Sequence, residues 1–201
     1  SGFNMVLMFY AFLNIAFAVA SFFLIPKFEG EIIKTKKKFD LSELVAAVKH
    51  PGVWLTTLCM FFTYTVYTSL SYTVPYVQAV FGASVAMAAL MGNIRMYGTS
   101  LFSSPIIGAL ATKIKSPAKT ILLCMAITAI CLFVIVLAPQ TAGFMIPAII
   151  LIMILSFFLS GAYGVESSLF TETKVPAAIF GSASGILSLI GFLPDMFVSP
   201  I

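Results

Sequence analysis

The sequence predicts an all-α integral membrane protein, and three observations lead to this prediction. First, 61% of the residues are hydrophobic and only 9% are charged, whereas soluble domains carry charge at roughly a quarter of their positions. Second, the apolar residues gather into six long segments. Third, every lysine lies in a link between these segments. One water-soluble core cannot bury so many apolar residues, so we expect the chain to lie in a lipid bilayer.

Each of the six segments is long enough to cross a bilayer as a helix, which takes about 20 apolar residues. The segments must be helical, because backbone groups inside lipid find no water to bond. They are also too long and too evenly apolar for the strands of a membrane barrel. The six predicted transmembrane helices span Met5–Ile25, Val53–Val80, Ala83–Ala111, Thr120–Ala138, Gly143–Val165 and Val175–Ile201.

The lysines predict which way the helices run. They fall only in the first, third and fifth links, and the second and fourth links have none. Cytoplasmic links carry an excess of lysine and arginine, so the lysine-bearing links are predicted to be cytoplasmic. The first segment would then run inwards and the sixth outwards. We expect a multi-pass protein of the plasma (inner) membrane.

The first link, residues 27–52, contains a predicted surface helix. Asp40 with Glu43 three residues later is typical of a helix N-terminus. Pro51 and Gly52 would end the helix. Four apolar residues between these points recur at helical spacing and form one stripe, namely Leu41, Leu44, Val45 and Val48. We therefore expect a short amphipathic helix on the cytoplasmic surface of the membrane.

A short sequence recurs three segments apart. Residues 102–106 read FSSPI and residues 197–201 read FVSPI. The two predicted helices cross the membrane in opposite directions. The match therefore indicates inverted repeats, which secondary transporters often contain, with a binding site between them.

The chain has one arginine, Arg95, and it lies inside the third apolar segment. It follows Ser84, near the outer end of that segment, by 11 residues, which at about 1.5 Å per residue places it roughly 16 Å deep. A guanidinium at this depth is costly, by about 2.5–3.5 kcal/mol, and should face a cavity or a partner. Two interpretations remain open: an ion pair with Asp195 or with an acid outside this sequence, or a site for the anionic group of a solute. Thr99, one turn later, shares the helical face of Arg95.

A polar and aromatic stripe follows one face of the second predicted helix. Such a stripe on a membrane helix usually packs inwards. It is either a wall of a solute cavity or a contact between helices. The candidate solute-binding residues of this stripe are Tyr64, Tyr67, Thr68, Ser71 and Tyr72.

Two acids within the apolar segments are candidates for coupling or gating. Asp195 belongs to the outer half of the last segment and follows Pro194, so it either couples to protons or caps a break in the helix. Glu166 lies near the cytoplasmic end of the fifth segment, where a gate or an interfacial salt bridge is expected.

Catalytic chemistry has no candidate residues. The single histidine, His50, stands at a predicted helix break, and the three cysteines have no spacing typical of metal or redox sites. Neither a nucleophile with its base nor a cluster of acids at membrane depth is apparent. We expect no enzyme, no cofactor, no metal ion and no nucleic-acid partner.

Three stretches of the chain resemble the major facilitator superfamily of secondary transporters. The long basic link followed by KHPGVW, residues 49–54, is similar to the family's central cytoplasmic loop and the start of its seventh helix. Residues 172–195, ETKVPAAIFGSASGILSLIGFLPD, resemble the approach to the eleventh helix and its body. The third stretch, residues 108–119, is similar to the family's loop motif Gly-x-Leu-Ala-Asp-basic-x-Gly-basic.

That loop motif is matched in part. Thr112 stands where the motif has Asp, and Lys115 stands where it has Gly, so the charge pairing that the motif supplies is altered here. The matching residues are Gly108, Leu110, Ala111 and Lys113.

The resemblance implies a twelve-helix transporter with inverted repeats, of which this chain is a fragment with helices six to eleven. Residues 1–26 would be the last helix of the N-terminal half and residues 27–52 the cytoplasmic linker. Residues 53–201 would be the C-terminal half, truncated before its last helix, and the partner N-terminal half would be missing.

The function implied is secondary active transport, by symport or antiport, of a small polar solute through alternating access. The arginine favours an anionic solute, and a proton or another ion would be the coupling partner. The alternative is a membrane scaffold or receptor that has the fold of a transporter and does not transport.

Overall fold

The computed structural model describes residues 2–24 and 41–198. The chain divides into two compact units, Ser1–Asp40 and Leu41–Ile201. The first unit contains α1 (Gly2–Leu24), which confirms that the first apolar segment is helical. The second unit holds all the other helices and the candidate functional site.

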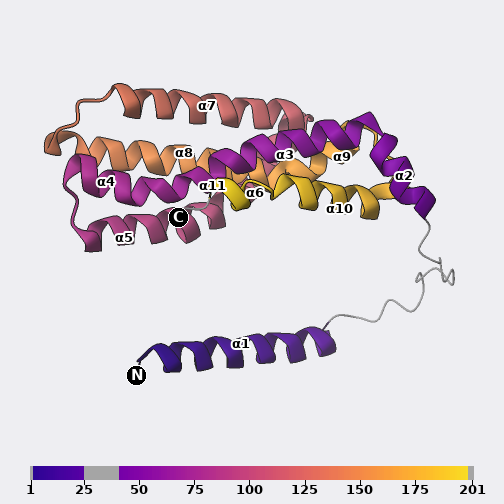
Figure 1. Cartoon of the computed structure of the whole chain (residues 1–201), viewed down its shortest axis with the longest axis horizontal. Coiled ribbons are helices and arrows are strands. Elements are labelled where there is room, and N and C mark those ends of the chain that lie inside the picture. The colour runs from indigo at the N-terminus through magenta and orange to yellow at the C-terminus, as the bar shows by residue number, and fades with distance from the viewer. Residues whose placement is uncertain (1, 25–40, 199–201) are drawn as a thin grey trace. The chain divides into compact units, whose positions relative to one another are not determined.

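The second unit is a bundle of helices, and no β-strand occurs in the described ranges (Figure 1). It begins with α2 (Leu41–Lys49), which lies across one end of the bundle beside α3 and α10. The remaining elements are α3 (Pro51–Ser69), η1 (Leu70–Tyr72), α4 (Thr73–Phe81), α5 (Val85–Asn93), η2 (Ile94–Thr99), α6 (Ser100–Ile114), α7 (Pro117–Leu137), η3 (Ala142–Phe144), α8 (Met145–Val165), η4 (Glu166–Ser168), α9 (Leu169–Glu172), η5 (Ala177–Ile179), α10 (Phe180–Gly191) and α11 (Asp195–Val198).

The all-α membrane fold predicted from the sequence is confirmed. Four helical stretches among the described residues are long and apolar enough to cross a membrane. A shorter apolar helix covers Met5–Ser21. The third predicted segment is helical as well, from Val85 to Ile114, but η2 interrupts it. The total of six spans stays a prediction. The four stretches are Pro51–Phe81, Pro117–Leu137, Met145–Glu172 and Ala177–Val198.

The helix boundaries follow from local capping chemistry. His50 precedes α3, and its Nδ1 accepts a hydrogen bond of 3.1 Å from the backbone N–H of Gly52. Ser116 precedes α7, and its Oγ accepts a hydrogen bond from the N–H of Lys119 at 3.2 Å. Both helices have proline as their first residue, where a missing N–H costs nothing. At the other end of the second span, Gly82 stops α4 with a φ of 69°, which glycine adopts without strain.

The carboxylate of Glu172 ties α9 to the start of α7. It accepts a hydrogen bond of 2.6 Å from the hydroxyl of Ser116 and one of 2.7 Å from the backbone N–H of Ala118. A negative group is favourable at a helix N-terminus, where backbone N–H groups have no partner inside the helix. Nothing in the sequence spacing predicts this contact, because it joins residues that are 56 and 54 positions apart.

The short helix predicted in the first link is present as α2, although its predicted cap, Asp40, lies outside the described residues. Ala47 is fully buried and Leu44 packs against the same core cluster, which includes residues of α3 and α10. The other three residues of the predicted apolar stripe are exposed. The position of α2 on the cytoplasmic surface of the membrane stays a prediction.

Helices α6 and α8 make close contact through small residues on α8. A Cβ atom built on Gly161 would lie only 2.2 Å from Cγ1 of Ile107, and one on Gly164 would lie 2.8 Å from Oγ of Ser104. The hydroxyl of Ser160 accepts a 3.4 Å hydrogen bond from Ser100 in the same interface. Small residues allow membrane helices to approach closely, and here they hold α6 against the centre of the bundle.

Candidate functional site

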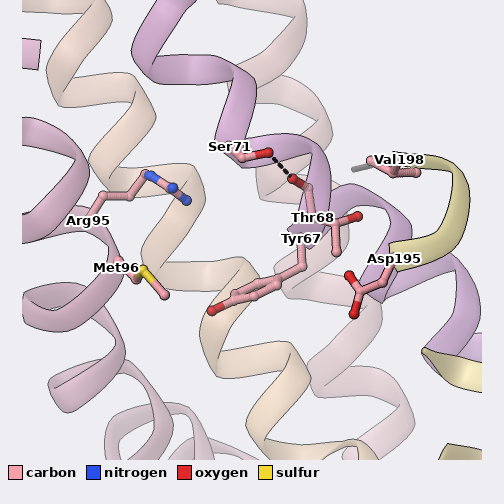
Figure 2. Close-up of a pocket in the computed structure, with 7 residues that line it drawn as sticks. All are labelled: Tyr67, Thr68, Ser71, Arg95, Met96, Asp195 and Val198. Carbon is pink, nitrogen blue, oxygen red and sulfur yellow. Dashed lines mark hydrogen bonds between the residues drawn. The ribbon is translucent and has the colours of Figure 1, made fainter. Parts of the chain in front are cut away.

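A cavity of about 290 Å³ opens between α3, η1, η2 and α11. It holds the arginine and an acid that the sequence singles out, together with three residues of the polar stripe. Figure 2 shows Arg95 and Asp195 on opposite sides, with Tyr67 between them. The lining residues are Tyr67, Thr68, Ser71, Arg95, Met96, Asp195 and Val198.

The backbone that carries Arg95 departs from the α-helix. Residues Ile94–Thr99 form η2, a π-helical turn, between α5 and α6. The hydroxyl of Thr99 donates a hydrogen bond to the backbone carbonyl of Arg95. Thr99 does not line the cavity, and this bond assigns it a role in supporting the π-turn. Single π-turns inside α-helices are frequent at functional sites, and the sequence pattern did not predict this one.

Arg95 has no acid partner in the described part of the chain. Its side chain is half-buried, and its Nε is buried without a hydrogen bond. Asp195 faces the same cavity, but its Oδ2 accepts a hydrogen bond of 2.9 Å from the hydroxyl of Tyr64. Arg95 and Asp195 therefore form no ion pair in the structure. An ion pair of Arg95 with an acid outside this sequence, the other form of that interpretation, stays a prediction. The carboxylate of Asp195 does not cap a backbone N–H among the described residues, as the break after Pro194 suggested it could.

The hydroxyl groups of the cavity present oxygen lone pairs to a solute. Thr68 donates its hydrogen to the carbonyls of Tyr64 and Thr65, both at 3.1 Å. Ser71 donates to the carbonyl of Thr68 at 2.7 Å (Figure 2). A hydroxyl that has donated its hydrogen still accepts hydrogen bonds. The cavity thus combines a cationic donor on one side with acceptors and a carboxylate on the other.

Four aromatic rings form one wall beside this cavity. Tyr67 stacks on Tyr163 at 5.4 Å between ring centroids, and on Tyr64 at 6.0 Å. Phe192 meets Tyr64 edge to face at 4.8 Å. Such ring pairs stabilise a packed cluster beyond the area they bury. Tyr163 was missed in the sequence because it lies alone in GAYG and belongs to no polar stripe.

The remaining predicted residues lie outside the cavity. The hydroxyl of Tyr72 donates a 2.9 Å hydrogen bond to the carbonyl of Val198 and so holds α11 against η1. Tyr64 contributes its hydroxyl to Asp195 and does not line the space itself. Glu166 is almost fully buried, beside Thr63 in the middle part of α3. Met96 and Val198 line the cavity as apolar residues that the sequence pattern did not single out.

Removal of the Tyr64 hydroxyl should lower stability more than removal of the hydroxyl from its neighbour. We expect Tyr64→Phe to destabilise the protein by about 1–2 kcal/mol, because the carboxylate of Asp195 loses the hydrogen bond that the Tyr64 hydroxyl donates to it. Tyr67→Phe is the matched control, since the Tyr67 hydroxyl makes no hydrogen bond within the described ranges. Thermal unfolding in detergent without solute measures both. Equal melting temperatures for the two variants would contradict the assigned role of Tyr64.

Comparison with known proteins identifies the family. The family model described as Major Facilitator Superfamily matches residues 1–199. The inner membrane protein YqcE of Escherichia coli (strain K12) is 30% identical over 168 residues, which cover 83% of this chain and 40% of that protein. The inner membrane protein YihN of the same strain is 26% identical over 211 residues, which cover 98% and 48%. No solved structure is significantly similar to the chain.

The chain spans less than half the length of these two relatives. The family model covers nearly all of it, and the family consists in general of membrane transporters rather than enzymes. The apolar helices and the relatives named as inner membrane proteins agree with a multi-pass position in the plasma (inner) membrane. The chain therefore belongs to the Major Facilitator Superfamily.

Proposed function

We propose that the chain forms part of a secondary active transporter that moves a small, polar, anionic solute by alternating access. The cavity around Arg95 would be its solute site. The observation that carries this proposal is an arginine that faces the cavity without an acid partner in the described part of the chain. A buried charge without a partner is costly, and a solute anion would satisfy it.

The other groups of the cavity favour a solute that also carries hydroxyl groups. Thr68, Ser71 and Asp195 offer oxygen acceptors, which a hydroxyl group of the solute can satisfy by donating. Arg95 could hold a carboxylate or phosphate through two parallel hydrogen bonds. The volume of about 290 Å³ suits a solute of a few carbon atoms. Hydroxylated carboxylates and phosphate esters combine these properties.

In the proposed transporter the chain supplies helices six to eleven. Residues 1–26 would close the N-terminal half, residues 27–52 would link the halves, and residues 53–201 would form the C-terminal half without its last helix. The chain spans less than half of each of the two relatives named above, which fits a chain with about half of the helices of such a transporter. The solute site would lie between the two halves, as in transporters built from repeats. Asp195 and Glu166 would serve coupling or gating.

A thermal-shift comparison of the complete transporter tests the proposed function. Three anionic solutes are each matched with a neutral analogue: gluconate with glucose, and glycerate and glycerol 3-phosphate with glycerol. We expect at least one anion to raise the melting temperature while its neutral analogue does not. Arg95→Lys should remove most of the shift, since an ammonium cannot copy the planar fork of arginine.

Two outcomes would contradict the proposal. If no anion stabilises the wild-type protein more than its neutral analogue does, the anionic solute site is wrong. If an anion stabilises the protein but no flux into vesicles follows, the protein is a receptor with the fold of a transporter.

A further inference from the structure

Glu166 is a buried acid at a break between two helices. It ends α8 and begins η4, a short turn that leads into α9. Its exposed fraction is 2%, and neither carboxyl oxygen makes a hydrogen bond of good geometry within the described residues. An ionised carboxylate without partners is costly in such a place, because it gives up its hydration and forms no hydrogen bond or ion pair in exchange. The neutral, protonated acid avoids this cost.

Among the described residues, no cation compensates the carboxyl group of Glu166 from the elements that pack around it. The nearby titratable groups that feel its charge are the thiol of Cys59 on α3 and the phenol of Tyr163 on α8. α7 contributes the buried thiol of Cys124 to the adjoining core. α9 carries another acid, Glu172, which is directed at the start of α7. The titratable groups around Glu166 are thus thiols, a phenol and one distant carboxylate.

Glu166 lies between two cavities. On one side Tyr163 adjoins it and stacks on Tyr67, which lines the solute cavity. On the other side the hydroxyl of Thr63 lies beside the carboxyl group, and Thr63 lines a second cavity of about 550 Å³. The second cavity reaches Glu172, the last residue of α9, at the end of the bundle that the lysines predict to be cytoplasmic. Two stacked rings, those of Tyr163 and Tyr67, therefore stand between Glu166 and the solute cavity. On the other side, the hydroxyl of Thr63 stands between Glu166 and the second cavity, which reaches the predicted cytoplasmic side.

We propose that Glu166 is the group that carries the coupling proton of the transport cycle, which deepens the proposed function and rests on it. In the conformation described here the acid holds its proton. The O–H bond breaks when water enters the break between α8 and α9 from the second cavity. The proton then leaves on that water as hydronium and the carboxylate remains, hydrated, until it is protonated again. The ring of Tyr67, which lines the solute cavity, stacks on Tyr163 beside Glu166, and this stack links binding of the solute to release of the proton from Glu166.

Infrared spectroscopy of the complete transporter tests the protonation directly. A buried, protonated carboxylic acid absorbs in its own carbonyl-stretch band, apart from the bands of a carboxylate. We expect this band at neutral pH in the wild-type protein and its loss in Glu166→Gln, a neutral replacement of similar shape. Glu172→Gln is the control and should leave the band unchanged. A band that persists in Glu166→Gln, or that is absent from the wild type, would overturn the proposal.

Transport in vesicles tests the coupling, which a merely structural protonated acid would not provide. The probe is gluconate, glycerate or glycerol 3-phosphate, whichever binds best in the thermal-shift comparison. Glu166→Gln should exchange this solute across the membrane at equilibrium, but a pH gradient should no longer drive its accumulation, so that the ratio of inside to outside concentration falls to unity. Accumulation driven by the gradient in Glu166→Gln would refute the coupling role.

The two proposals can fail separately. If none of the three anions binds the wild-type protein, the proposed function has failed, and the infrared result still decides whether Glu166 holds a proton. If an anion binds and is transported while Glu166→Gln accumulates it normally, only the coupling role has failed.

Discussion

Replacement of Arg95 by alanine is expected to abolish transport of the anionic solute by the complete protein. The substitution removes the guanidinium that faces the cavity, and with it the charge-assisted hydrogen bonds that we propose for the solute. The folded protein should remain in the membrane at normal levels, because the cost of burying the charge, about 2.5–3.5 kcal/mol, disappears with it. Uptake into vesicles and melting temperature in detergent are measured on the same preparation.

Lys49→Ala is the control for this experiment. Lys49 is a cation in the last turn of α2 and does not line the cavity, so its loss should leave uptake unchanged. If Arg95 instead pairs with an acid outside the described residues, Arg95→Ala would leave that acid buried alone and destabilise the protein strongly. If Arg95→Lys keeps its affinity for the solute while its melting temperature drops strongly, the solute-site interpretation is wrong.

Replacement of Gly161 by valine is expected to cause the largest loss of stability among the substitutions considered. The new Cβ would meet Ile107 at 2.2 Å from Cγ1 and 2.7 Å from Cβ, well inside contact distance. Ile107 is buried and cannot swing aside, so α6 and α8 would have to separate. Overpacking of this kind typically costs about 1–3 kcal/mol, and two branched methyl groups place Gly161→Val at the upper end.

Gly108→Val is a matched control on the facing helix. It introduces the same side chain into a helix at a glycine whose Cβ would meet no atom within 4 Å. Its melting temperature should stay close to that of the wild type. The double variant of Gly161→Val with Ile107→Ala should recover part of the lost stability, because the clashing side chain is shortened. Equal melting temperatures for the two valine variants would disprove the close approach of α6 and α8.

The helices could be predicted because lipid leaves the backbone few alternatives. An apolar segment of span length must satisfy its own hydrogen bonds, so length and composition predict a helix. Helix ends such as His50–Pro51 and Ser116–Pro117 also follow from local chemistry. The helix α2 was predicted from its start and stop signals and from apolar spacing, whereas the contact of Ala47 and Leu44 with a core cluster that includes α10 depends on residues distant in sequence.

The site could be predicted only where a charged or polar residue occurs in a membrane segment that is otherwise apolar. Arg95 drew attention because a charge in lipid needs an explanation, and the polar stripe of α3 indicated an inward face. Met96 and Tyr163 are ordinary membrane residues, so their place beside the cavity depends on how helices distant in sequence pack. The link between Glu172 and Ser116 is of the same kind, since no local pattern joins positions so far apart.

The π-turn at η2 has a consequence for the comparison of related sequences. A π-turn holds one residue more than an α-turn of the same helix, so a relative that lacks one residue within 94–99 could keep both α5 and α6 intact. Loss of that residue would rotate the side chains of the segment by about 100° relative to one flanking helix. An arginine aligned with Arg95 in such a relative would then point away from the cavity. Alignment of the arginine alone is therefore a poor guide to shared solutes, and the length of the segment around it is the better criterion.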